Sequence, residues 1–205
     1  AEQEKITRAV QDAEKQTSGE IVPMIVSESH RYPLAAVSGA TFISLPLALL
    51  IAQLIGSHFW IGPHNMWLFL ACFMLLFVLF HQLVQNVSWL KKRFLSPRRV
   101  EEEVRDGAIR AFFTKELYRT KAQNGIIIYI SVFERRVWIL GDKGINEKIP
   151  QDRWQEIVDS VTQGIRENRQ GEVICEAVTR IGDMLKEFFP YTKDDTDELH
   201  NLIID

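Results

Sequence analysis

Charged residues are absent from one long part of the chain. Of the 205 residues, 24 are Lys or Arg and 27 are Asp or Glu, yet none of these lies between residues 32 and 90. The formal net charge of −3 therefore comes entirely from the remainder of the chain, which is rich in charge. The two parts suit different surroundings, since the uncharged part suits lipid and the charged part suits water.

Motifs of several enzyme and metal-binding classes are also absent. The sequence has no P-loop, no paired-aspartate phosphotransfer motif and no zinc-ligand spacing. Only two cysteines occur. Because Cys72 lies in the uncharged part and Cys175 lies on a helical pattern, we expect neither a disulfide framework nor a reactive cysteine loop. We therefore assign no catalytic residue, and an enzyme is not the favoured interpretation.

The uncharged part contains two segments that are long enough to cross a membrane. Residues 33–55 and 66–90 each match the roughly 20 apolar residues that a hydrocarbon core of about 30 Å requires. The loop between them, "GSHFWIGPHN", is rich in turn-forming residues. A pair of buried core helices is the alternative, but the rest of the chain is too short to cover so much apolar surface. We expect a transmembrane helical hairpin at residues 32–90.

Basic residues lie at both ends of the hairpin and are absent from its connecting loop. Arg31 precedes the first segment, five basic residues follow the second, and the connecting loop has no Lys or Arg, so both ends are expected in the cytoplasm of a two-span protein of the bacterial inner membrane. We expect the five residues and two from a later turn to contact anionic lipid. The alternative is that the cluster only sets topology and the turn is solvated. These residues are Lys91, Lys92, Arg93, Arg98, Arg99, Arg135 and Arg136.

The charged parts of the chain predict one α/β domain that the hairpin splits. We divide the chain into domain residues 1–31 and 91–190, the hairpin at 32–90, and an acidic tail at 191–205 in which residues 199–203 form a short docking segment. Gly141 and Gly144 predict a loop. The predicted elements are a helix at 2–16, a strand at 21–27, a helix at 97–118, strands at 126–133 and 136–140, and helices at about 154–165 and 174–188.

Several short sequences in this domain resemble the TPM domain family. They are "TSGEI" at the first strand, "GIIIYISVFERRVWILGDKGI" at the later two strands, the helix of Trp154, and the final "FFP". Family members include thylakoid repair proteins and an auxiliary subunit of a nematode receptor. The resemblance implies a mixed β-sheet flanked by helices, and with it either a phosphatase activity, divalent-cation binding by acidic loop residues, or a role in assembling membrane complexes. Many relatives carry a "GYGLE" type loop where this chain has "LGDKGI".

Three carboxylates are candidate cation ligands. If the first two strands are parallel and the third is antiparallel, Glu20 and Asp142 lie at the same end of the sheet, and Asp152 lies near the start of the next helix. Such oxygen ligands suit a hard cation such as Ca²⁺. The favoured alternative is that Asp142 and Asp152 cap a turn and a helix while Glu20 is solvated. The expected cofactor is therefore none, with a divalent cation as the alternative.

Small residues recur at the start of the first span. Ala35 with Gly39 and Ala36 with Ala40 are spaced four apart, which allows close helix approach in lipid. We expect this face to pack against the second span or against a partner; small residues that simply face lipid are the alternative.

Two functions follow as hypotheses. The first is a non-enzymatic, membrane-anchored adaptor that helps to assemble or maintain a membrane protein complex. The second is a divalent-metal-dependent phosphatase at the membrane surface. The expected partners are the lipid bilayer and either a membrane protein or a second copy of the chain, with no nucleic acid.

Overall fold

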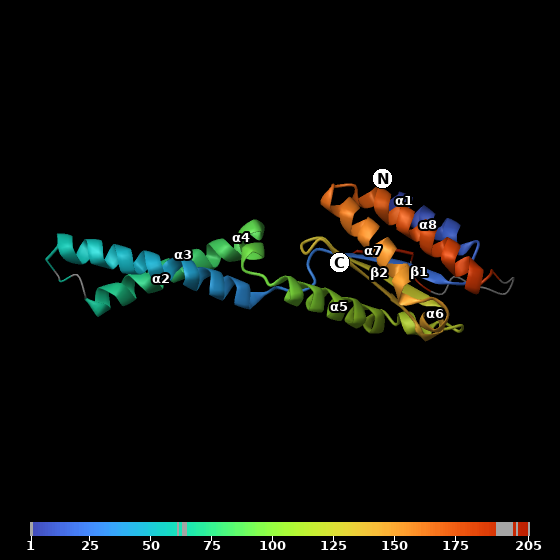
Figure 1. Ribbon diagram of the computed structural model, residues 1–205, viewed down its shortest axis with the longest axis horizontal. Coiled ribbons are helices and arrows are strands. Elements are labelled where there is room, and N and C mark those ends of the chain that lie inside the picture. The colour runs from blue at the N-terminus through green and yellow to red at the C-terminus, as the bar shows by residue number, and fades with distance from the viewer. Residues whose placement is uncertain (1, 61, 63–64, 192–198, 200, 205) are drawn as a thin grey trace. The chain divides into compact units, whose positions relative to one another are not determined.

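The chain folds as two compact units. The first joins Ala1–His30 to Val100–Asp205, and the second consists of Arg31–Arg99. The second unit contains the whole uncharged part of the sequence. The computed structural model, drawn as a ribbon in Figure 1, describes residues 2–60, 62, 65–191, 199 and 201–204.

The first unit is built on a mixed four-stranded sheet. Its strand order is β3-β2-β1-β4. β1 pairs in parallel with both β2 and β4, while β2 and β3 form an antiparallel hairpin. The sheet confirms the predicted α/β class, and its central strands are runs of Ile and Val because β-branched side chains pack well on a pleated, buried surface. The strands are β1 (Glu20–Val26), β2 (Gly125–Ser131), β3 (Arg136–Gly141) and β4 (Ile203–Ile204).

Helices cover both faces of this sheet, as Figure 1 shows. Strand residues alternate between two cores, because successive side chains point to opposite faces. Ile126 and Ile128 pack with α1, α7 and α8, whereas Ile127 and Tyr129 pack with α5. The helices are α1 (Glu2–Glu14), α5 (Pro97–Thr114), α6 (Lys143–Lys148), α7 (Gln151–Arg166) and α8 (Gln170–Phe188), with a 3₁₀ turn at Leu117–Arg119.

The structure of this unit differs from the sequence-based prediction at α6 and adds a short strand, β4, near the C-terminus. The predicted loop at Gly141 and Gly144 is wrong, because α6 begins at Lys143, where the Asp142 side chain accepts a hydrogen bond from the Lys143 N–H at 2.7 Å. The docking segment predicted at 199–203 is confirmed at Ile203, which pairs with Met24 of β1. Most of the predicted acidic tail lies outside the described residues.

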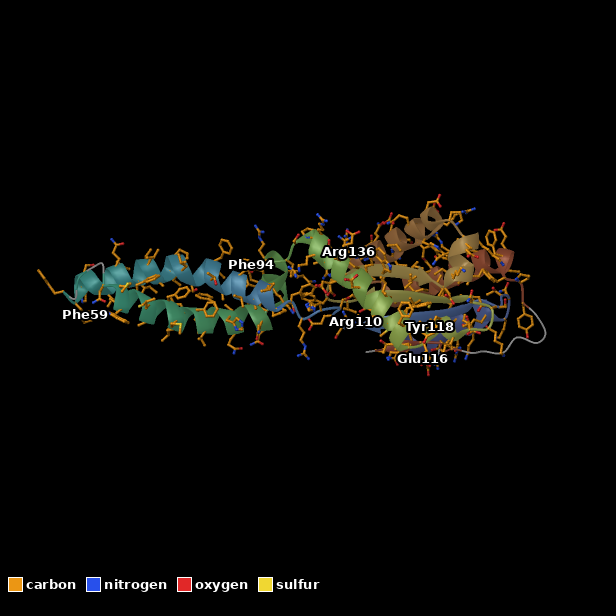
Figure 2. All side chains as sticks on the ribbon, turned by 90° about the horizontal axis from the view of Figure 1, so that it is seen from below. Phe59, Phe94, Arg110, Glu116, Tyr118 and Arg136 are labelled. Atoms are coloured by element: carbon orange, nitrogen blue, oxygen red, sulfur yellow. The ribbon has the colours of Figure 1, made fainter. Side chains whose placement is uncertain are left out.

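The second unit is a hairpin of two long helices and one short helix. α2 (Pro33–His58) and α3 (Met66–Asn86) are both long and apolar enough to cross a membrane. α3 begins where the Asn65 side chain accepts hydrogen bonds from two backbone N–H groups. It ends earlier than the predicted Leu90, and a separate helix, α4 (Ser88–Arg93), follows. Figure 2 shows Phe59 and Phe94 at opposite ends of this hairpin.

Candidate functional site

A cleft of about 410 Å³ lies along β3 in the first unit. Val137 and Ile139 of β3 line it together with Trp154 and Val158 of α7. Polar side chains of α7, among them Gln163, also line it. The lining therefore combines apolar side chains with polar ones, which is the usual composition of a ligand-binding cleft.

The cleft exists because β3 is the last strand of the sheet on this side. α7 packs on β3 through a buried stripe that includes Trp154, Ile157 and Val161. Val158 and Thr162 lie beside this stripe and line the cleft. An α-helix with its side chains is wider than one strand of a sheet. One side of α7 therefore extends past β3, and no further strand among the described residues lies beneath it.

Two arginines mark one end of the cleft. β3 ends where α6 and then α7 begin, so α7 returns antiparallel to β3. Arg166, in the last turn of α7, therefore lies at the same end as Arg136, the first residue of β3, and both line the cleft. Figure 2 labels Arg136. Glu101 and Asp159 line the cleft as well. Within the described residues neither arginine has a carboxylate within 4.0 Å, so both guanidinium groups are available to a ligand.

The fold places two of the three predicted cation ligands in one row of the sheet. Glu20 pairs with Gly125 across β1 and β2, and the Asp142 N–H donates to the Gly125 carbonyl at 2.8 Å. Glu20 and Asp142 are thus about two strand spacings, roughly 10 Å, apart. Gly125 lies between them and has no side chain.

The third predicted ligand, Asp152, lies on a helix that covers the other face. Glu20 lies on the same face of β1 as Val22 and Met24, because side chains two apart share a face. Val22 and Met24 pack with α5, whereas α7 packs on the opposite face of the sheet. Asp152 instead accepts a hydrogen bond from the Arg153 N–H at 3.1 Å. In the part of the chain that the structure describes, no group of three or more His, Cys, Asp or Glu side chains is placed to hold a metal ion.

The small residues predicted for helix packing lie inside the hairpin. Ala35, Ala36, Gly39 and Ala40 are all buried, and a Cβ atom on Gly39 would lie 2.7 Å from the Phe94 ring. The pattern is longer than the sequence analysis found, since a small residue is buried at every fourth position along α2. This stripe consists of Ala36, Ala40, Ser44, Ala48, Ala52 and Gly56.

The basic residues predicted to contact lipid have different surroundings. Lys91 is buried in the hairpin unit, with its Nζ 5.7 Å from the centre of the Tyr32 ring. The other four residues of the post-span cluster, Lys92, Arg93, Arg98 and Arg99, are exposed.

Arg135 is also exposed, at the turn between β2 and β3, with a left-handed φ of 52°. Glu134 holds this turn, because its carboxylate accepts hydrogen bonds from the Ser131 hydroxyl and, at 3.1 Å, from the Ser29 N–H.

Cys175 is the one cysteine of the first unit and lies on α8. Burial raises the pKa of its thiol, an effect that the nearby Lys5 partly opposes. A raised pKa means that less of the nucleophilic thiolate is present at neutral pH. The local chemistry is that of a packing residue, in agreement with the interpretation from the sequence.

The sequence analysis did not predict the cleft. Val158 follows Trp154 by four positions and precedes Thr162 by four, so a second stripe beside the main apolar stripe of α7 was visible in the sequence. That stripe was a signal of a surface left partly uncovered.

Comparison with known proteins identifies the domain. The sequence model of the TPM domain family matches residues 95–184. This match covers less than half of the chain and shows TPM-type sequence in that part. The match begins after the hairpin, whereas in this chain the TPM domain also uses β1 from before it. No curated protein matches the sequence.

A solved structure is also similar to the chain. The NMR structure of BA42 protein from the psychrophilic bacterium Bizionia argentinensis is 22% identical, with a TM-score of 0.60, and the alignment covers 100% of this chain and 92% of that one. At this identity the similarity shows the fold alone, an α/β arrangement.

Proposed function

We propose that the chain is a membrane-anchored adaptor whose TPM domain recognises a membrane protein partner. The observation that carries this proposal is the apolar outer surface of the hairpin. Soluble proteins rarely expose large contiguous apolar patches to water. A lipid environment removes the free-energy cost of exposing such side chains. The large apolar side chains of this unit with more than half of their surface exposed are Leu34, Phe42, Leu49, Leu50, Leu54, Phe59, Trp60, Met66, Trp67, Met74, Leu75, Val78, Leu79 and Trp89.

The cleft beside β3 supports the recognition part of the proposal. It combines an apolar lining with a polar rim that includes Arg136 and Arg166 at one end, and Glu101 and Asp159 line it as well. An anchor that holds such a cleft near the membrane raises the local concentration of membrane proteins around it. We further propose that the domain faces the cytoplasm of a bacterial inner membrane, and the basic residues that flank the spans support the cytoplasmic orientation.

Photo-crosslinking in native membranes tests the adaptor proposal. A photoreactive amino acid at position 163, on the rim of the cleft, is expected to capture one defined membrane protein, which mass spectrometry identifies. The same group at Lys5, on α1 and away from the cleft, is the matched control and is expected to capture that protein much less. Equal capture at both positions would contradict recognition through the cleft.

A divalent-metal-dependent phosphatase is the second candidate. The observation in its favour is the row that holds Glu20 and Asp142, where Asp142 Oδ2 is buried without a hydrogen-bond partner in the described residues. If this function is correct, the purified chain hydrolyses a generic phosphoester with Mg²⁺ or Ca²⁺, and Asp142→Asn abolishes turnover. Absence of turnover with either metal would reject the phosphatase and leave the adaptor unaffected.

The contact of the basic residues with lipid stays a prediction, and Arg135 offers the clearest test. A spin label at position 135 is expected to approach the headgroups when anionic lipid is present, because each basic residue near a charged leaflet gains on the order of 1 kcal/mol. Depth is measured by collision with a lipid-soluble relaxation agent, with a label at exposed Arg8 of α1 as control. Equal depths with and without anionic lipid would contradict the contact.

A further inference from the structure

The outer edge of β3 presents backbone groups to the cleft. The Asp142 N–H donates a hydrogen bond to the Gly125 carbonyl. Hydrogen-bonded residues alternate with non-bonded residues along an antiparallel ladder, so every second residue of β3, counted back from Asp142, also bonds to β2. The N–H and C=O groups of Val137 and Ile139 therefore point away from β2, to the side where the sheet ends. Farther along this edge, the Gly141 carbonyl accepts a hydrogen bond from Asn146 Nδ2 at 2.6 Å, which closes the open stretch.

The cleft provides room for side chains beside this edge. Val137 and Ile139 belong to the face of the sheet that α7 covers, and both line the cleft with Val158 and Trp154. A strand added to β3 would place every second side chain among these apolar groups. This combination of a free strand edge and a neighbouring helix is the geometry of peptide recognition by strand addition.

The charges of the cleft set the direction of such a strand. Arg136 and Arg166 lie at the end where β3 begins. Glu101 and Asp159 also line the cleft, but in the described residues neither arginine forms an ion pair. A guanidinium pair of this kind is complementary to a carboxylate. A peptide whose C-terminal end lies between the two arginines runs antiparallel to β3, the direction that most paired strands adopt.

We propose that the cleft binds an extended apolar peptide segment of the partner protein, which adds to β3 as an antiparallel strand and places its C-terminal carboxylate between Arg136 and Arg166. This inference deepens the adaptor proposal and rests on it. It names the chemistry of the partner: alternating apolar residues that end in a negative charge.

Fluorescence anisotropy with the full chain in detergent micelles tests the binding mode. The probe is a fluorescein-labelled hexapeptide of alternating threonine and valine with a free C-terminal carboxylate. The free acid is expected to bind, its C-terminal amide to bind about tenfold more weakly, and a version with N-methylated valines to lose binding, because it cannot form the ladder. Equal binding of all three peptides, or no binding of the free acid, would overturn the proposal.

Variants of the chain assign the contacts. Arg136→Gln and Arg166→Gln are each expected to remove the difference between acid and amide, whereas Arg153→Gln, on the exposed first turn of α7 and outside the cleft, preserves it. Ile139→Pro removes one outward N–H and is expected to abolish binding. Hydrogen exchange of β2 verifies that this variant is folded. If Arg153→Gln also removed the difference, the assignment to the cleft would be wrong.

Two further outcomes separate this inference from others. If the chain forms a dimer that Val158→Lys dissociates, the edge belongs to a second copy of the chain, and the peptide proposal is wrong. If the hexapeptide fails to bind while crosslinking from position 163 still captures one membrane protein, strand addition fails and the adaptor proposal stands. Failure of both experiments would reject both.

Discussion

A chain that begins at Val100 is expected to lose the folded TPM domain, whereas a chain with a linker of about eight Gly and Ser residues in place of residues 31–99 is expected to keep it. The reason is that β1 lies inside the sheet, between β2 and β4. Four of its buried side chains, all apolar, are each worth roughly 1.5–3 kcal/mol, which together rivals the roughly 5–15 kcal/mol that stabilises a typical domain. They are Ile21, Val22, Met24 and Val26.

The linker can be short because the two cut ends lie close together in the first unit. His30 Nδ1 lies 4.0 Å from Glu103 Oε2 at the start of α5. Thermal melting followed by circular dichroism checks both chains, and a peptide of residues 1–30 added to the shortened chain is expected to restore a cooperative transition. Cooperative melting of residues 100–205 alone would show that β1 is dispensable.

Gly125→Ala is expected to destabilise the domain strongly. A Cβ atom at this position would lie 2.4 Å from the backbone carbonyl oxygen of Leu117, so the 3₁₀ turn must move away from the sheet. Forcing extra volume into a packed site costs about 1–3 kcal/mol, and the contact with backbone places this site at the upper end. Hydrogen exchange of β2 amides in the full chain is expected to accelerate by about fivefold to 150-fold, which corresponds to that range of free energy.

Gly171→Ala is the matched control. Its Cβ atom would approach only the Glu2 side chain, at 3.2 Å, which can move. The residue lies near the start of α8, where Ala is the better helix former, so its effect is expected to be neutral or slightly stabilising. If hydrogen exchange accelerated similarly in both variants, the loss of a glycine, and not the contact with Leu117, would be what weakens the domain.

Much of the fold could be predicted from local pattern. The runs of Ile and Val identified the strands, and the long chain between β1 and β2 allowed the crossover that parallel pairing needs. The sequence analysis took parallel pairing as a condition, and the structure has it. The loop at Gly141 and Gly144 was wrong because two glycines were given more weight than Asp142, which caps α6. β4 has only two residues and is too short to show strand alternation at all.

The candidate site was harder to predict, because it depends on spatial order that sequence pattern does not contain. The cleft requires β3 to be the edge strand and α7 to cross it, and neither can be read from Val137, Ile139 or Val158 separately. The same limit applies to the cation ligands. Strand direction correctly placed Glu20 and Asp142 at one end of the sheet, but nothing in the sequence says which face α7, and with it Asp152, covers.

The split of the domain around the hairpin has a consequence for biosynthesis. Roughly a hundred residues separate β1 from β2, so at about 5–20 residues per second the first strand waits several seconds for its neighbour while the proposed spans enter the membrane. β1 and β2 can then pair only if both ends of the hairpin emerge on the same side. A chain with a single inserted span, or with one end on the wrong side, leaves β1 without its sheet and open to proteases. For the proposed membrane-anchored chain, closure of the sheet would act as a checkpoint for membrane insertion, because the stable protein would be the one whose two spans were inserted correctly.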